Sequence, residues 1–253
     1  MPLFRRPNLI LSFVLCVAAP ALGQDTTTVT TNSIGLGTGY AYAGFKSEKF
    51  SALMQTGSGL PVQAYFRRST ARTRLHFQAY YTSLSLTSGY ATLVTREHNG
   101  QLQFGAHYRV GNKPKKITTW IGFVLDAQGA HRDFSSTFGG GTAENNSSDE
   151  GFLSLNPSVL FEHKVGSDKL GLQIWASILA YVVRPVEGTN AVEGKFVSLH
   201  TFSKTEARLS YSKYFSRRWE GRIDGQFQFY ALSLDQTVYK INSQLVASIA
   251  YKL

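Results

Sequence analysis

The sequence predicts an all-β fold, an antiparallel transmembrane β-barrel of about ten strands that follows a cleaved signal peptide. Many segments of about ten residues alternate between apolar and polar side chains, as a tilted strand does when one face meets lipid and the other a lumen. The composition agrees, because hydrophobic residues make up 43% of the chain and the mean hydropathy is −0.14. Alternating strands give a moderate hydrophobic content and mean hydropathy of this kind, whereas long apolar helices give higher values.

The N-terminus predicts export. In Met1–Gly23, Arg5 and Arg6 precede a short apolar run and a small-x-small cleavage pattern, which is the arrangement of a secretory signal peptide. The run is too short for a membrane-spanning helix of about 20 residues. The only cysteine, Cys16, lies in this segment, so the mature chain has no thiol for a disulfide, a metal site or a nucleophile. We expect a signal peptide at 1–23, a short periplasmic lead at 24–32 and the barrel domain at 33–253.

The last thirteen residues predict the closing strand. Their apolar side chains share one parity, at Ile241, Leu245, Ala247, Ile249, Tyr251 and Leu253. This stretch resembles the closing strand of bacterial outer-membrane β-barrel proteins, with Leu253 standing where the usual ending is Phe. The resemblance implies an outer-membrane location, and it implies that Ile249, Tyr251 and Leu253 form the signal read by the insertion machinery. It does not imply a particular activity.

The other strands follow from the same alternation. Gly35, Gly37 and Gly39 share a face of the first strand, where they leave room for bulky neighbours; no strand precedes them and no helix follows, so a nucleotide site is disfavoured. Residues 196–214 contain two alternating pieces around Lys204, which we interpret as one strand because single-chain barrels have an even number. Ten strands are expected, with eight or twelve as alternatives: 34–45, 60–67, 73–86, 96–110, 117–128, 151–163, 170–183, 196–214, 219–232 and 241–253.

Connection lengths predict the orientation. Longer connections, including 47–59 and the polar stretch 131–150, alternate with four short ones: 69–72, 111–116, 164–169 and 215–218. Barrels of this kind keep short turns in the periplasm and long loops outside. Aromatic side chains near the short turns are expected to form a periplasmic girdle at the membrane interface: Tyr108, Phe161, Tyr211, Trp219 and Tyr251.

Several ionisable side chains fall on the faces predicted to line the lumen. A ten-strand barrel encloses a space that side chains largely fill, and a buried charge without a partner is very costly. We therefore expect a plug of ion pairs, with a selective path for small solutes as the alternative. The expected lumen network is Arg74, His76, His107, Arg109, Asp126, Glu162, Glu206, Arg208, Arg222 and Asp224.

Basic residues predict a positive rim in the periplasm. Without Arg5 and Arg6 the chain has 24 basic and 16 acidic residues, a net charge of +8. Such a rim suits anionic phospholipid headgroups of the inner leaflet, whereas nucleic acid is not an expected partner of a secreted barrel. Much of the excess lies near the short turns, at Arg67, Arg68, Arg72, Arg74, Lys113, Lys115, Lys116, Lys213, Arg217 and Arg218.

Three enzyme hypotheses have weak candidates. Asp126, His131 and Asp133 suit a protease of the omptin type, whose Asp and His groups lie at the outer rim. A lipid A deacylase is disfavoured because His163 lies near the wrong leaflet without an adjacent Ser. A calcium-dependent phospholipase would require Ser and His close on one strand, for which His200 with Ser198 or Ser203 is the nearest approach. The histidines show no zinc-binding spacing, and no metal or cofactor is expected.

The sequence therefore predicts an integral outer-membrane barrel that is structural or a narrow channel for small solutes, with a largely filled lumen. The alternatives are a lipid-modifying or proteolytic barrel enzyme, and an accessory subunit of a transport or secretion complex. Expected partners are outer-membrane lipids, the insertion machinery, and a protein that docks through the external loops or the basic rim.

Overall fold

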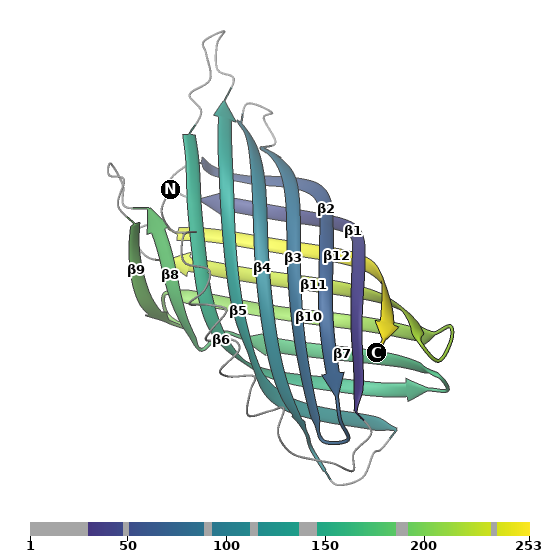
Figure 1. The fold of residues 1–253 in the computed structure, drawn as a ribbon. Coiled ribbons are helices and arrows are strands. Elements are labelled where there is room, and N and C mark those ends of the chain that lie inside the picture. Colours follow the sequence, from purple (N-terminus) through teal and green to yellow (C-terminus); the bar gives the residue numbers. More distant parts are fainter. Residues whose placement is uncertain are drawn as a thin grey trace. The chain divides into compact units, whose positions relative to one another are not determined.

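The computed structural model describes residues 30–47, 51–88, 93–111, 116–136, 146–185, 192–233 and 237–253. Residues 31–253 belong to one compact unit built of antiparallel strands (Figure 1). No helix in the described ranges is long and apolar enough to cross a membrane. The predicted signal peptide lies outside these ranges. The strands are β1 (Thr31–Ser47), β2 (Ser51–Ser69), β3 (Thr73–Ser88), β4 (Leu93–Arg109), β5 (Ile117–Ser136), β6 (Asn146–Val165), β7 (Asp168–Ala176), β8 (Leu179–Pro185), β9 (Val192–Ser198), β10 (Phe202–Tyr214), β11 (Trp219–Ser233) and β12 (Thr237–Lys252).

The sheet closes into a barrel. Its order is β5-β4-β3-β2-β1-β12-β11-β10-β7-β6, and β5 pairs with β6 to complete the wall. β6 pairs with β7 near one end and with β8 near the other, so β7 and β8 occupy one strand position. β9 and β10 likewise share the next strand position, because β9 pairs with β8 and β10 pairs with β7. The wall therefore has ten strand positions. The predicted fold class, a closed antiparallel barrel of ten strands, is confirmed.

The single strand predicted over 196–214 is interrupted, and not at Lys204. The turn Leu199–Thr201 separates β9 from β10, and the Thr201 N–H donates to the carbonyl of Ser198 at 3.0 Å. The Ser233 N–H in turn donates to the Thr201 carbonyl at 2.7 Å, while β9 pairs with β8. Lys204 lies within β10, and its side chain is buried inside the barrel.

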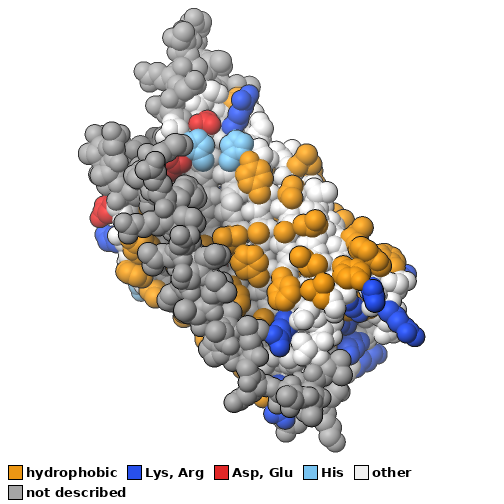
Figure 2. Space-filling view, viewed as in Figure 1, with side chains coloured by type: hydrophobic (Ala, Val, Ile, Leu, Met, Phe, Trp, Pro, Cys, Tyr) orange, Lys and Arg blue, Asp and Glu red, His pale blue; other side chains and the backbone are white. Residues whose placement is uncertain are grey.

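The two faces of the wall differ as the alternation predicts. On β4, Leu102 and Tyr108 face outward, whereas Gln101, Gln103 and His107 are buried. Figure 2 shows the outer face, where hydrophobic side chains form a band across the strands and Lys and Arg side chains gather near one end. A closed barrel with an apolar outside and a polar inside suits a lipid environment.

The two ends of the barrel are distinguished by their connections. The short-turn end has the turns at 70–72, 166–167 and 215–218, together with the C-terminus. The opposite end is called the long-loop end. Strands lengthen toward it, since β5 and β6 each have 20 residues, whereas about 9 to 11 cross a bilayer.

Two predicted loops are partly strand. Residues 51–59 of the predicted loop 47–59 belong to β2. The predicted loop 131–150 is shorter, because β5 and β6 stay paired as far as Phe134 and Asn146. Side-chain polarity changes where lipid ends, but backbone pairing does not depend on it. β1 likewise starts at Thr31, inside the predicted lead.

The interior near the long-loop end is apolar. Phe152 packs against Phe202 with ring centroids 4.9 Å apart and against Tyr230 at 5.6 Å. The apolar cluster consists of Ala41, Ala43, Phe45, Leu84, Leu86, Phe134, Phe152, Ala180, Val182, Val197, Phe202, Tyr230, Leu232 and Val238.

Candidate functional site: the filled lumen

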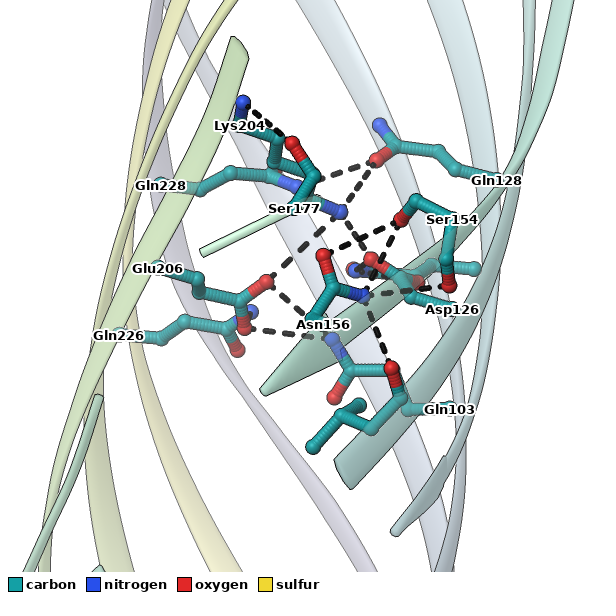
Figure 3. Close-up of polar contacts among 12 residues, drawn as sticks. Gln103, Asp126, Gln128, Ser154, Asn156, Ser177, Lys204, Glu206, Gln226 and Gln228 are labelled. Atoms are coloured by element: carbon teal, nitrogen blue, oxygen red, sulfur yellow. Dashed lines mark hydrogen bonds and ion pairs between the residues drawn. The ribbon is translucent and has the colours of Figure 1, made fainter. Parts of the chain in front are cut away.

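The middle of the lumen is blocked by a charged layer, called the plug: Asp126, Lys204, Glu206 and Arg208 with the amides of Gln78, Gln103, Gln128, Gln226 and Gln228. Figure 3 shows these side chains, except Gln78 and Arg208, meeting from different parts of the wall. Lys204 binds Asp126 and lies 3.8 Å from Glu206. Two cations and two carboxylates balance, as buried charges require.

The amides complete the plug. Gln103 Nε2 donates to both oxygens of Glu206, at 3.3 and 3.2 Å, and its Oε1 accepts from Arg208 Nη2 at 2.7 Å. Gln226 also donates to Glu206, and Arg208 donates to Gln78. Ser177, at the break between β7 and β8, accepts the backbone N–H of Lys204 at 3.0 Å. The break therefore supplies a bond that anchors Lys204.

Contacts within the plug cross the full width of the barrel. β3 and β10 are five positions apart in a ring of ten, so they are diametrically opposite. Arg208 on β10 nevertheless donates directly to Gln78 on β3. Lys204 on β10 also binds Asp126 on β5, which is three positions away around the ring. These contacts place charged and amide side chains across the middle of the barrel at this level.

A second charged layer lies beside the apolar cluster. Arg132 donates to Glu97 at 2.7 Å, to Glu150 at 2.9 Å and to the hydroxyl of Tyr230 at 3.1 Å. Its guanidinium lies 4.4 Å from the ring centroid of Phe45, and Lys240 binds Glu97.

The remaining predicted lumen residues lie toward the short-turn end. Arg74 binds Glu162, and Arg222 binds Asp224 at 2.7 Å. The rings of His76 and His107 stack 5.5 Å apart, and His107 Nε2 is 3.0 Å from the Ser158 hydroxyl. Arg109 is half-buried at the end of β4. All ten predicted residues thus lie on inward faces, and four of them, Asp126, Glu206, Arg208 and Asp224, are buried to 2% exposure or less.

Two residues predicted for the basic rim belong to the lumen. Arg67 pairs with Glu220 at 2.7 Å, and Arg74 pairs with Glu162, because both arginines lie on inward faces. Lys113 and Lys115 lie outside the described ranges, and Arg68 is half-buried. The exposed members are Arg72, Lys116, Lys213, Arg217 and Arg218.

The structure brings the catalytic candidates His131 and Asp133 together, but not Asp126 or His200. Asp126 is buried in the plug, whereas His131, an odd number of residues away on β5, faces outward. His131 Nδ1 lies 2.7 Å from Asp149 and Nε2 lies 3.2 Å from Asp133. The hydrogen bond to Asp149 raises the pKa of His131 above its usual range. His200 is exposed in the turn between β9 and β10, and its ring has no hydrogen bond within the described ranges.

Outward aromatic side chains surround the short-turn end. Tyr108, Phe161, Tyr211 and Trp219 are exposed, and Trp219 packs edge-on against Tyr251 with centroids 5.1 Å apart. Ile249 and Leu253 also face outward, at 61% and 72% exposure. Their places suit the predicted girdle and insertion signal, both of which stay proposals.

Sequence reasoning missed several buried charges. Glu97, Arg132, Glu150, Lys204 and Lys240 were absent from the predicted network, although all are buried. The detectable signal was parity, since Arg132 continues the inward series of Asp126 and Gln128. Among the described residues, no group of three or more His, Cys, Asp or Glu side chains is placed to hold a metal ion.

Comparison with known proteins shows the fold. No family model and no curated protein sequence matches the chain. The outer membrane protease OmpT from Escherichia coli aligns with a TM-score of 0.56 at 9% identity, over 91% of this chain and 99% of its own. The translocator domain of the autotransporter NalP from Neisseria meningitidis aligns at 0.49 and 9% identity, over 96% and 95%. The likeness to OmpT is one of fold alone. The closed antiparallel barrel with its apolar outer face is the fold of integral outer-membrane β-barrel proteins.

Proposed function

We propose that the protein is a closed structural barrel that does not conduct solutes, with its short-turn end in the periplasm. The observation that carries the proposal is the direct contact between Arg208 and Gln78 on diametrically opposite strands. A wall-to-wall hydrogen bond at mid-barrel occupies the axis along which a solute would pass.

The energetics of the plug favour closure. A solute on the barrel axis would have to separate Arg208 from Glu206, which lie 3.4 Å apart with side-chain exposures of 3% and 0%. Breaking a buried pair typically costs about 3 to 5 kcal/mol.

The two ends suit different compartments. The exposed basic residues Arg72, Lys116 and Lys213 lie at the short-turn end, where they can contact anionic headgroups of the inner leaflet. The opposite ends of β5 and β6 extend past the apolar band, which suits exposure outside the cell.

An enzymatic role is less well supported. His131 is the candidate with carboxylate partners, but both of its ring nitrogens are engaged, by Asp149 and Asp133. A general base requires a nitrogen within reach of a substrate or water proton. The docking of a partner protein rests on the loops, most of which lie outside the described ranges.

Conductance in planar bilayers tests the proposal. The purified barrel is expected to give no discrete current steps. The double variant Arg208→Ser/Glu206→Ser removes one cation and one carboxylate together and leaves the neutral Lys204–Asp126 pair in place, so it should give steps.

A matched control is Glu193→Ser/Lys195→Ser, which makes the same charge change at exposed positions of β9. It should be silent like the unmodified protein. Steps from the unmodified protein equal to those of the plug variant would instead establish a channel.

A further inference from the structure

A chamber lies between the plug and the short-turn end. Its volume is about 300 Å³, and it is lined by the ends of strands around most of the barrel. Gln78 and Arg208 of the plug form its inner limit, while Thr31, Tyr214 and Lys252 lie near the strand ends. Small-molecule sites in proteins start at about 300 Å³, so the chamber has room for one small ligand.

The charges that line the chamber do not balance. Six basic side chains face it, against two carboxylates, Glu162 and Glu220. Those two are already paired with Arg74 and Arg67. The other two arginines are also paired, Arg208 with Glu206 at 3.4 Å and Arg222 with Asp224 at 2.7 Å. The two lysines, Lys169 and Lys252, have no carboxylate within ion-pair distance among the described residues.

Both lysines converge on one aromatic side chain. Lys169 Nζ donates to the hydroxyl of Tyr214 at 2.9 Å. Lys252 Nζ lies 3.5 Å from the centroid of the same ring. The attraction of a cation to an aromatic face is modest, and two like charges this near each other repel in a partly buried site. The arrangement carries two positive charges without a counterion.

The chamber is also rich in donors that the protein leaves unused. Arg67 Nε, Arg74 Nε and Arg208 Nε are buried without a hydrogen-bond partner in the protein. Arginine nitrogens can only donate. A ligand that fits this surface must therefore bring acceptor atoms and negative charge.

We propose that the chamber binds a small phosphoryl oxyanion, with Lys169 and Lys252 as its main charge partners. A phosphate monoester carries up to two negative charges and three acceptor oxygens, which match the two surplus cations and the unused donors. Charge-assisted hydrogen bonds of this kind are the stronger ones in proteins. The phosphoryl group comes either from a soluble ligand or from a phospholipid headgroup that enters at the short-turn end.

Binding is tested by calorimetric titration of inorganic phosphate and glycerol 3-phosphate into the barrel in nanodiscs of zwitterionic lipid. Sodium chloride of equal ionic strength gives the reference. Saturable binding is expected. Lys169→Gln/Lys252→Gln should weaken it at least tenfold, whereas Lys169→Arg/Lys252→Arg should retain it because the charge is kept.

The matched control is Lys116→Gln/Lys213→Gln, which removes two charges from exposed positions at the same end. Affinity should be unchanged. Absence of binding beyond the salt reference, or equal weakening by the control, would overturn the proposal, since the second result would indicate general attraction to the rim. Heat-modifiable migration on gels checks that each variant is folded.

The same titration in nanodiscs that contain anionic phospholipid separates the two sources. If anionic phospholipid weakens phosphate binding to the unmodified protein, the phosphoryl group comes from a lipid headgroup. If the affinity is unchanged, it comes from a soluble ligand. Either result supports the proposed site. The proposal goes beyond the closed-barrel function. Binding is measured without transport, so its failure would leave the conductance result standing.

Discussion

The two halves of the lumen are built on the same strands, yet they hold charge differently. In the long-loop half, Arg132 is 2% exposed and is enclosed by two carboxylates and a phenol. In the short-turn half, the side chains of Arg67 and Arg74 keep 25% and 20% of their exposure, and two lysines have no carboxylate partner. Charge balance is enforced where water is excluded, whereas a surplus is tolerated where water or a ligand can enter.

Side-chain size contributes to the difference. Inward positions of the long-loop half hold Phe45, Phe134 and Phe152. Inward positions around the chamber include Ser33, Ser210 and Ser212. A barrel of constant strand number has a similar cross-section throughout, so large side chains fill one half and small ones leave space in the other.

The first prediction tests whether the barrel assembles when its closing strand is cut short at the short-turn end. Deleting Ala250–Leu253 should abolish assembly, because these residues pair with both β1 and β11. Their loss leaves unpaired backbone groups at two strand edges, and it removes the proposed insertion signal. The measurement is heat-modifiable barrel in the outer-membrane fraction.

A deletion of equal length in the connection between β5 and β6, at 140–143, is the control and should assemble. Leu253→Phe should assemble at least as well as the unmodified chain. A normal amount of heat-modifiable barrel from the C-terminal deletion would show that the barrel assembles without the end of β12.

The second prediction compares an arginine from each half. Arg132→Ala leaves Glu97 and Glu150 each short of a partner in a dry site, so the free energy of unfolding should fall by about 3 to 5 kcal/mol. Arg74→Ala, beside the chamber, should cost clearly less because the side chain of its partner Glu162 keeps 15% exposure, so water reaches it more readily. Urea unfolding in lipid measures both. Equal losses would contradict the contrast between a dry and a wet half.

The third prediction compares aromatic residues. Phe202→Ala should lower the free energy of unfolding by about 3 kcal/mol, because it opens a cavity in the apolar cluster. Tyr214→Ala should cost less, since the ring borders space that already exists and separates two like charges. The same unfolding assay applies, and a greater loss for Tyr214→Ala would show that the chamber is more tightly packed than the cluster.

The fourth and smallest effect concerns charge outside the lumen. On the outward face of β5, Ala127 is followed by Gly129, His131 and Asp133, beyond the apolar band. The pKa of His131 lies above its ordinary value of 6.5 because of the hydrogen bond to Asp149. The stabilisation is therefore complete below that ordinary value and is lost as pH rises through the raised pKa.

An NMR titration of the His131 ring should give a midpoint above 6.5, and Asp149→Asn should lower it. A midpoint at or below the ordinary value would show that the contact with Asp149 does not persist in solution. Because these side chains are largely exposed, we expect no large change in the stability of the barrel.

Strand faces were predictable because parity is a local property. Leu102, Gln103 and Phe104 alternate in the chain as they do on the wall. We expected Arg74 in both the basic rim and the lumen. The prediction from its parity, an inward position, agrees with the structure. The partners were not predictable, since Lys204 and Asp126 are 78 residues apart and meet only through the stagger of the strands. Arg132 and Glu150 were missed because they fell in the predicted loop 131–150, and a polar sequence looks alike in a loop and in a strand beyond the lipid.

The bond between Arg208 and Gln78 joins residues 130 positions apart in the chain. Neither strand is the other's neighbour, so this cross-brace forms only when both halves of the wall have met. Until then, each polar group of the plug must remain hydrated or find a temporary partner. Closure of the wall and exclusion of water from its centre are thus expected to coincide late in assembly, when the cross-brace links opposite walls of the barrel.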